Sequence, residues 1–127
     1  MKEIIDYSIN FNADLRSVCE VLYEFINPKL CNNICKLYHG SPVWFIDDNP
    51  ITGYSMKGNK ISLLFWSGQS FIEEGLSSVG KFKAAEIVYS NINEINFDKL
   101  EKWVNESQKI MWNYKDIRKN NGILSLL

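Results

Sequence analysis

The sequence predicts an α+β fold, a two-layer sandwich in which an antiparallel sheet of about four or more strands packs on N- and C-terminal helices. Three observations support this prediction. Apolar residues recur at helical spacing near both ends of the chain, short β-branched and aromatic runs between turn residues fill its middle, and strands do not alternate with helices. This arrangement favours a helix layer on one face of the sheet.

Two helices are expected before the strands. Apolar residues at three-to-four spacing predict the first helix from Ala13 to Ile26, with Asn12 or Asp14 capping its start. Pro28 is expected to begin a second helix, because proline needs no N–H at the first helical position. The apolar side of this second helix would be formed by Leu30, Ile34 and Leu37. It is expected to stop at His39-Gly40-Ser41-Pro42.

The middle of the chain predicts an antiparallel meander. Residues 43–46, 51–56 and 61–66 form short runs rich in β-branched and aromatic side chains, and turn residues separate them. A fourth strand is expected at residues 84–89. The intervening residues 67–83 predict a loop that contains a short helical turn.

The strongest local signal predicts a last helix that continues for four turns. Ile95 precedes the expected cap, Asn96, and Leu100 lies four positions inside the helix, which fits a hydrophobic staple. The helical face is formed by Leu100, Trp103, Val104, Ser107, Ile110, Met111 and Tyr114. Residues 118–127 are expected to form a loosely held tail, whose apolar side chains must cover something or meet a partner.

Length and composition predict a single domain over residues 1–127. The chain has the commonest domain size and lacks repeats, low-complexity tracts and linker-like stretches. Fourteen basic and fifteen acidic residues give a net charge of −1, so no overall field favours nucleic acid or an anionic membrane. No apolar run approaches the roughly 20 residues of a membrane span. Three cysteines without a signal peptide favour the cytoplasm.

Five motifs occur in a distinctive order along the chain. They are His39-Gly40-Ser41-Pro42-Val43-Trp44-Phe45, Gly53-Tyr54, Leu64-Phe65-Trp66-Ser67-Gly68-Gln69, Gly80-Lys81-Phe82-Lys83-Ala84-Ala85-Glu86 and Trp112-Asn113-Tyr114-Lys115. This combination resembles the YdhG-like family, a group of small bacterial domains of unknown function, over residues 12–117. The resemblance implies helices packed on an antiparallel sheet. Some relatives are described as frataxin-like iron chaperones, whereas the chain is more similar to a tryptophan-rich branch without an assigned activity.

Common catalytic signatures are missing, so no catalytic residue is assigned and an enzyme of undetected type is the third hypothesis. Such an enzyme would need His39, the only histidine, as its base. Cys31 and Cys35 lie eight and four residues before His39, but a structural zinc site needs four ligands. These cysteines are therefore interpreted as core residues. The segment Gly80–Lys83 lacks the spacing of a phosphate-binding loop.

The second hypothesis is an intracellular iron chaperone, which rests on the resemblance. Glu20 and Glu24 lie one helical turn apart, and Asp47 and Asp48 follow the first strand of the meander. Carboxylate oxygens suit hard or borderline cations such as iron. The alternative interpretation is that these carboxylates form an ordinary solvated surface. Iron is expected only under this hypothesis, and otherwise no cofactor or metal.

The leading hypothesis is a non-catalytic binding domain. The first and third strands of the meander are apolar on both faces, whereas a half-exposed antiparallel sheet carries polar residues on one face. The loop, the tail, a second subunit or a ligand must therefore cover the second face. The expected ligand-binding residues are Trp44, Tyr54, Trp66, Gln69 and Lys81. The expected partner is a small ligand or a protein, and a homodimer is a further alternative.

Overall fold

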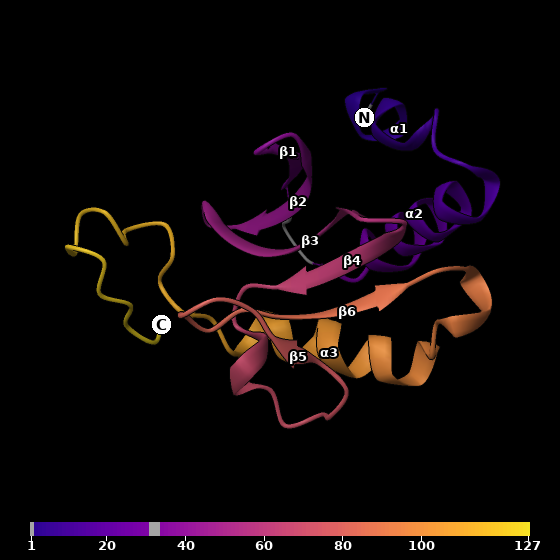
Figure 1. Cartoon of the computed structure of the whole chain (residues 1–127). Helices are drawn as coiled ribbons and strands as arrows, with labels where there is room; N and C mark the ends of the chain where they lie inside the picture. Colours follow the sequence, from indigo (N-terminus) through magenta and orange to yellow (C-terminus); the bar gives the residue numbers. More distant parts are fainter. Residues whose placement is uncertain (1, 31–33) are drawn as a thin grey trace.

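The computed structural model describes residues 2–30 and 34–127, which form three α-helices and a six-stranded antiparallel sheet (Figure 1). The predicted α+β class is therefore confirmed. The elements in chain order are α1 (Lys2–Ser8), α2 (Ala13–Ile26), β1 (Ile34–Tyr38), β2 (Ser41–Ile46), β3 (Asn49–Lys57), β4 (Lys60–Phe65), η1 (Gly68–Ser70), β5 (Ser77–Ser78), β6 (Ala85–Tyr89), η2 (Ile92–Glu94) and α3 (Phe97–Lys109). The strands lie in the order β1-β2-β3-β4-β6-β5.

The first predicted helix is confirmed as α2, with the bounds expected from the sequence. The side-chain oxygen of Asn12 caps it by accepting a hydrogen bond from the backbone N–H of Leu15, at 3.0 Å. Its buried face consists of Leu15, Val18, Cys19, Leu22 and Ile26. Spacing of three and four residues places these side chains on one stripe that faces the sheet.

Two-residue turns connect the first three strands. His39 and Gly40 join β1 to β2 with φ values of 53° and 85°, and Asp47 and Asp48 join β2 to β3 with φ values of 49° and 66°. Positive φ at both central residues is the signature of a type I′ turn, which matches the twist of antiparallel strands. The turns fix the meander, whose three predicted strands are confirmed as β2, β3 and β4, with β6 as the fourth.

The prediction of a second helix was wrong. Residues 34–38 form strand β1, which pairs with β2 from Ile34 opposite Phe45 to Tyr38 opposite Ser41. Short apolar runs suit a helix or a strand equally well, so the helical spacing did not discriminate between the two structures. The left-handed turn after Tyr38 decided the outcome, because it closes a hairpin that supplies β1 with hydrogen-bond partners on β2.

The last helix, α3, begins as predicted but ends sooner. The side chain of Asn96 accepts a hydrogen bond from the N–H of Lys99 at 3.1 Å, and the helix stops at Lys109. The expected continuation to Tyr114 was wrong, because Ile110 is extended, with φ −114° and ψ 104°. Hydrogen bonds to distant residues replace helical ones here, since the N–H of Trp112 donates to the Ser67 hydroxyl at 2.9 Å.

One face of the sheet, the inner face, packs against the helices and holds the core. In Figure 1, α3 runs along β6, while α1 and α2 lie toward one end of the sheet. The sheet contributes to this core Trp44, Tyr54, Ile61, Leu63, Phe65 and Tyr89. Helix α1 joins the same face through the ring of Tyr7, which lies 6.2 Å from that of Tyr54 and whose hydroxyl accepts a hydrogen bond from Met56 N–H.

The opposite, outer face of the sheet is also apolar, and side chains of the same chain cover part of it. Val43 and Phe45 are buried there, with the ring of Tyr38 packed edge-on against Phe45 at 5.3 Å. The C-terminal segment, residues 110–127, closes one end of the sheet and returns on itself (Figure 1). The N–H of Leu127 donates to the carbonyl of Met111 at 2.8 Å, which ties down the chain end.

Candidate functional site

The five residues expected to bind a ligand do not share one surface. Trp44 and Tyr54 point to the inner face, where they are 0% and 2% exposed. Trp66 follows Phe65 by one residue and therefore points to the outer face, where its ring lies 6.4 Å from that of Tyr38. Gln69 and Lys81 are exposed beyond the end of β4. The structure therefore separates the inner pair from Trp66 on the outer face and from the two exposed residues.

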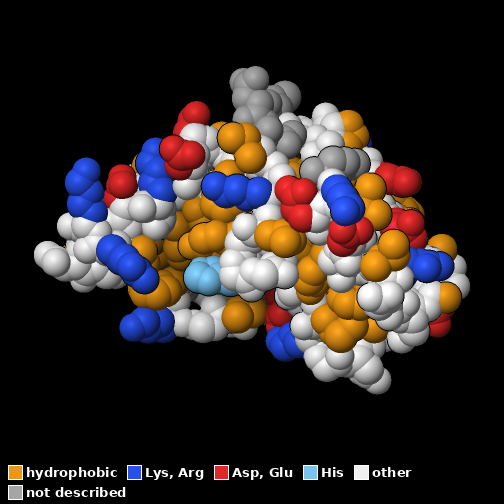
Figure 2. Space-filling view, turned by 90° about the horizontal axis from the view of Figure 1, so that it is seen from above, with side chains coloured by type: hydrophobic (Ala, Val, Ile, Leu, Met, Phe, Trp, Pro, Cys, Tyr) orange, Lys and Arg blue, Asp and Glu red, His pale blue; other side chains and the backbone are white. Residues whose placement is uncertain are grey.

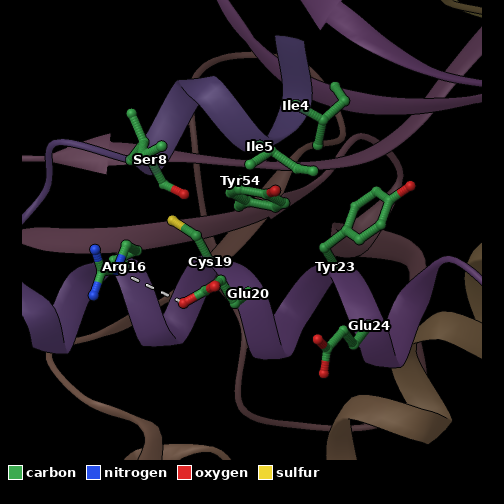
Figure 3. Close-up of a pocket in the computed structure, with 10 residues that line it drawn as sticks. Ile4, Ile5, Ser8, Arg16, Cys19, Glu20, Tyr23, Glu24 and Tyr54 are labelled. Atoms are coloured by element: carbon green, nitrogen blue, oxygen red, sulfur yellow. Dashed lines mark ion pairs between the residues drawn. The ribbon is translucent and has the colours of Figure 1, made fainter. Parts of the chain in front are cut away.

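Tyr54 of this inner pair lies on the floor of a cleft between α1 and α2 (Figure 3). The volume of the cleft is about 440 Å³, which falls in the range of small-molecule sites. Apolar and hydroxyl-bearing side chains form most of its lining: Ile4, Ile5, Ser8, Ile9, Cys19, Tyr23 and Tyr54. A cleft of this size with few polar groups suits a small molecule with an apolar body.

The position of the cleft follows from how α1 is held. Ile4 and Ser8 of α1 are buried, while Ile5 on the neighbouring side of the helix and Ile9 directly after its end stay 55% and 50% exposed. Residues four positions apart lie on the same side of a helical turn. The buried pair therefore anchors α1, and the exposed pair forms a wall of the cleft. An apolar ligand that covers these isoleucines would remove their apolar surface from water, and this burial would make the free energy of binding more favourable.

The floor of the cleft holds neutral groups. Burial raises the pKa of the Cys19 thiol to about 12, although hydrogen bonding with the Ser8 hydroxyl lowers it. In Figure 3 the Cys19 sulfur and the Ser8 hydroxyl point toward one another. Burial also raises the pKa of Tyr54 above its usual range. At neutral pH the floor therefore offers a thiol, hydroxyl groups and aromatic faces, and no anion.

Charged residues occupy only the rim of the cleft. Arg16 pairs with Glu20 at 3.8 Å, and this exposed pair is drawn as a dashed line in Figure 3. Glu24 lies one turn further along α2. Two carboxylates and one guanidinium leave the rim weakly acidic, which favours a ligand with a cationic rather than an anionic polar end.

The four carboxylates of the iron hypothesis lie in two places. Glu20 and Glu24 lie on the rim of the cleft, whereas Asp47 and Asp48 form the β2–β3 turn. The backbone carbonyl of Asp47 accepts a hydrogen bond from Lys115 Nζ at 3.3 Å, beside the C-terminal segment. Within the described residues, no three histidine, cysteine, aspartate or glutamate side chains gather as metal ligands would.

The histidine and cysteines are similarly dispersed. His39 lies in the β1–β2 turn against the ring of Tyr38, and Cys35 lies on β1 with a thiol pKa that burial raises to about 12. Cys31 falls outside the described residues. Cys35 lies on a strand rather than on the predicted second helix, and it packs against the core.

Sequence reasoning missed the α1 wall of the cleft. The signal was present, because Ile4 with Ser8 and Ile5 with Ile9 repeat at four-residue spacing. A seven-residue helix is too short to be stable alone, so nothing local indicated that this segment would fold. Packing of Ile4 and Tyr7 against the rest of the chain supplies the missing stabilisation.

Compared with protein-family models, curated proteins and solved structures, the chain gives no match. Among the described residues, no helix has the length and apolar character needed to cross a lipid bilayer.

Proposed function

We propose that this domain binds a small, mainly apolar ligand in the cleft between α1 and α2. The observation that carries the proposal is the exposed pair Ile5 and Ile9, which forms one wall of a cleft with the aromatic floor residue Tyr54. Half-exposed isoleucines cost free energy in water, and a ligand of matching shape would remove that cost. The proposal therefore concerns the cleft rather than the outer face of the sheet.

The chemistry of the lining favours binding over catalysis. A cysteine nucleophile needs its thiolate, whereas burial keeps Cys19 protonated by raising its pKa to about 12. Tyr54 and Tyr23 add aromatic faces that suit planar or branched apolar groups. The weakly acidic rim favours ligands whose polar end is neutral or cationic.

A neutral fluorescent probe tests the cleft before its natural ligand is known. N-phenyl-1-naphthylamine is expected to brighten on binding the native protein. Ile5→Glu, which places a charge on the wall, is expected to weaken that binding by at least tenfold. The matched control is Ile72→Glu, because Ile72 is 88% exposed and lies outside this cleft. Equal probe binding by the two variants would contradict the proposal.

A thermal-shift screen of small amines and neutral apolar compounds then identifies the ligand class. A ligand present at 100 times its Kd stabilises the native state by about 2.7 kcal/mol. For a chain of 127 residues this corresponds to a rise in Tm of about 10 °C. Hits should lose their effect in Ile5→Glu and keep it in Ile72→Glu.

A further inference from the structure

Trp66, one of the predicted binding residues, belongs to a second surface, on the opposite face of the sheet from the cleft. Its centre is a set of rings at the β1–β2 hairpin. Tyr38 lies 5.3 Å from Phe45 and 6.4 Å from Trp66, measured between ring centroids, and it also contacts His39 at 4.3 Å. The ammonium of Lys36 lies over the ring of Phe45, 4.7 Å from its centroid. Tyr38 remains 38% exposed.

A second set of rings and lysines adjoins this centre at the end of the sheet. Ser67, next to Trp66, accepts a hydrogen bond from the N–H of Trp112. The ammonium of Lys83 lies over the Trp112 ring at 4.6 Å. We call the whole set the aromatic–lysine surface, and it comprises Lys36, Tyr38, His39, Phe45, Trp66, Lys83, Trp112 and Lys115.

Figure 2 shows this side of the molecule. Hydrophobic side chains gather beside the single histidine, with lysine and arginine side chains around them and acidic ones along one edge. The residues of the surface come from the β1–β2 hairpin, the end of β4, the segment before β6 and the C-terminal segment. Distant parts of the chain therefore meet to form the surface.

The near-zero net charge conceals an uneven distribution. Four segments contribute to or border this surface: the β1–β2 hairpin, the β2–β3 turn, residues 79–84 before β6, and residues 110–127. Together they carry six basic residues, namely Lys36, Lys81, Lys83, Lys115, Arg118 and Lys119, and three acidic residues, namely Asp47, Asp48 and Asp116. The rest of the chain has eight basic and twelve acidic residues, so a local charge of +3 faces a charge of −4 elsewhere. The local excess of positive charge favours an anionic partner at these segments.

We propose that the aromatic–lysine surface binds single-stranded nucleic acid. Proteins that hold single strands combine aromatic side chains, on which bases stack, with cations that follow the phosphates. Tyr38 and Trp66 supply exposed and half-exposed rings, and the ammonium groups of Lys36 and Lys83 lie directly beside rings. The proposal departs from the expectation drawn from net charge, because binding depends on the local charge.

Two other occupants fit less well. A peptide strand added to the edge strand β1 would meet Lys36 in its middle, and a lysine on an edge strand opposes such pairing. An acidic peptide would use the lysines but would leave the rings without planar partners. Duplex nucleic acid would likewise engage the lysines through its phosphates while its paired bases stay stacked on each other.

The test measures the fluorescence anisotropy of a labelled 12-nucleotide oligo-uridine titrated with the protein at 50 mM salt. Two or three phosphate contacts predict a slope of log K against log salt of about −1.4 to −2. Tyr38→Ala removes one stacking ring and is expected to weaken binding by about fivefold or more. Lys36→Glu is expected to weaken binding at least tenfold. Its matched control, Lys60→Glu, makes the same charge change at an exposed position at the far end of β4 and should bind like the native chain.

Three results would overturn the proposal. The first is that the oligo-uridine does not bind at 100 μM protein. The second is that Lys36→Glu and Lys60→Glu weaken its binding equally. The third is that a poly-glutamate peptide or a duplex of the same length competes as well as unlabelled oligo-uridine. The last result would assign the surface to an acidic protein or to phosphate contacts without stacking. Circular dichroism of each variant confirms that the fold is retained, and Tyr38→Phe, which keeps the ring, should restore most of the binding.

Discussion

Replacing Trp44 by phenylalanine tests the account of how α2 is joined to the sheet. Trp44 is fully buried, its indole N–H donates to the side-chain oxygen of Asn27 at 2.9 Å, and its ring stacks on Tyr23 at 5.7 Å. Asn27 is the residue that ends α2, so this hydrogen bond ties the helix to β2. Phenylalanine keeps a ring in place but removes the donor and part of the apolar volume.

The expected loss has two parts. Loss of the indole N–H donor should lower the free energy of unfolding by about 1–2 kcal/mol. The smaller ring should lower it by about a further 1–2 kcal/mol, because less apolar surface is buried and a cavity is left. Unfolding entropy of about 2.1 cal/mol/K per residue makes 1 kcal/mol equivalent to about 4 °C for a chain of this length. Trp44→Phe should therefore lower the free energy of unfolding by about 2–4 kcal/mol and Tm by about 8–15 °C.

Urea denaturation followed by circular dichroism gives the free energy, and differential scanning calorimetry gives Tm. The matched control is Trp66→Phe, because Trp66 is half-buried on the outer face and should lose less than about 1 kcal/mol. A double-mutant cycle with Asn27→Ala isolates the hydrogen bond and should show coupling of about 1 kcal/mol. Equal losses for Trp44→Phe and Trp66→Phe, or coupling near zero, would refute the reasoning.

Three further predictions follow from the fold. Gly53→Ala should destabilise the protein by about 2–3 kcal/mol in urea, because its Cβ would lie 2.6 Å from the Pro42 carbonyl oxygen and 2.7 Å from a Val43 methyl; a loss below 0.5 kcal/mol would show that β2 and β3 separate easily. Asn96→Ala should cost about 1 kcal/mol by removing the cap of α3, and Asn96→Ser should recover most of it in the same assay. Burial raises the Cys19 pKa from its ordinary value of 9 to about 12, so the native state holds its proton more tightly than the unfolded state. The resulting stability is fully present below pH 9 and is lost as pH rises toward 12; denaturation midpoints measured from pH 8 to 11 should fall less steeply in Cys19→Ala, and parallel curves would exclude this contribution.

The two helix caps and the meander could be predicted because their signals are local. Asn12 and Asn96 each accept a hydrogen bond from a backbone N–H three residues later, so the cap and its partner lie within a single turn. The two residues of each tight turn likewise determine how adjacent strands meet. These elements depend on few residues outside themselves.

The errors fall where long-range contacts outweighed local preference. Residues 34–38 carry a helical spacing, but pairing with β2 across the His39-Gly40 turn made them a strand. The last helix has an apolar face beyond Lys109, yet hydrogen bonds from the 110–127 segment to Ser67 and Asn49 pull this stretch away from the helix axis. In both cases the competing partner is distant in sequence, so no local window contains it.

By itself the sequence determined the α+β class, helix α2, the meander and the presence of aromatic residues on both faces of the strands, because alternation along a strand is a local property. Only the tertiary structure decided which face meets the helices. Strand register places Trp44 and Phe65 on the inner face and Trp66 on the outer one. The cleft also required packing of a seven-residue helix that is not stable alone. Register and long-range packing therefore placed the predicted binding residues in different parts of the molecule.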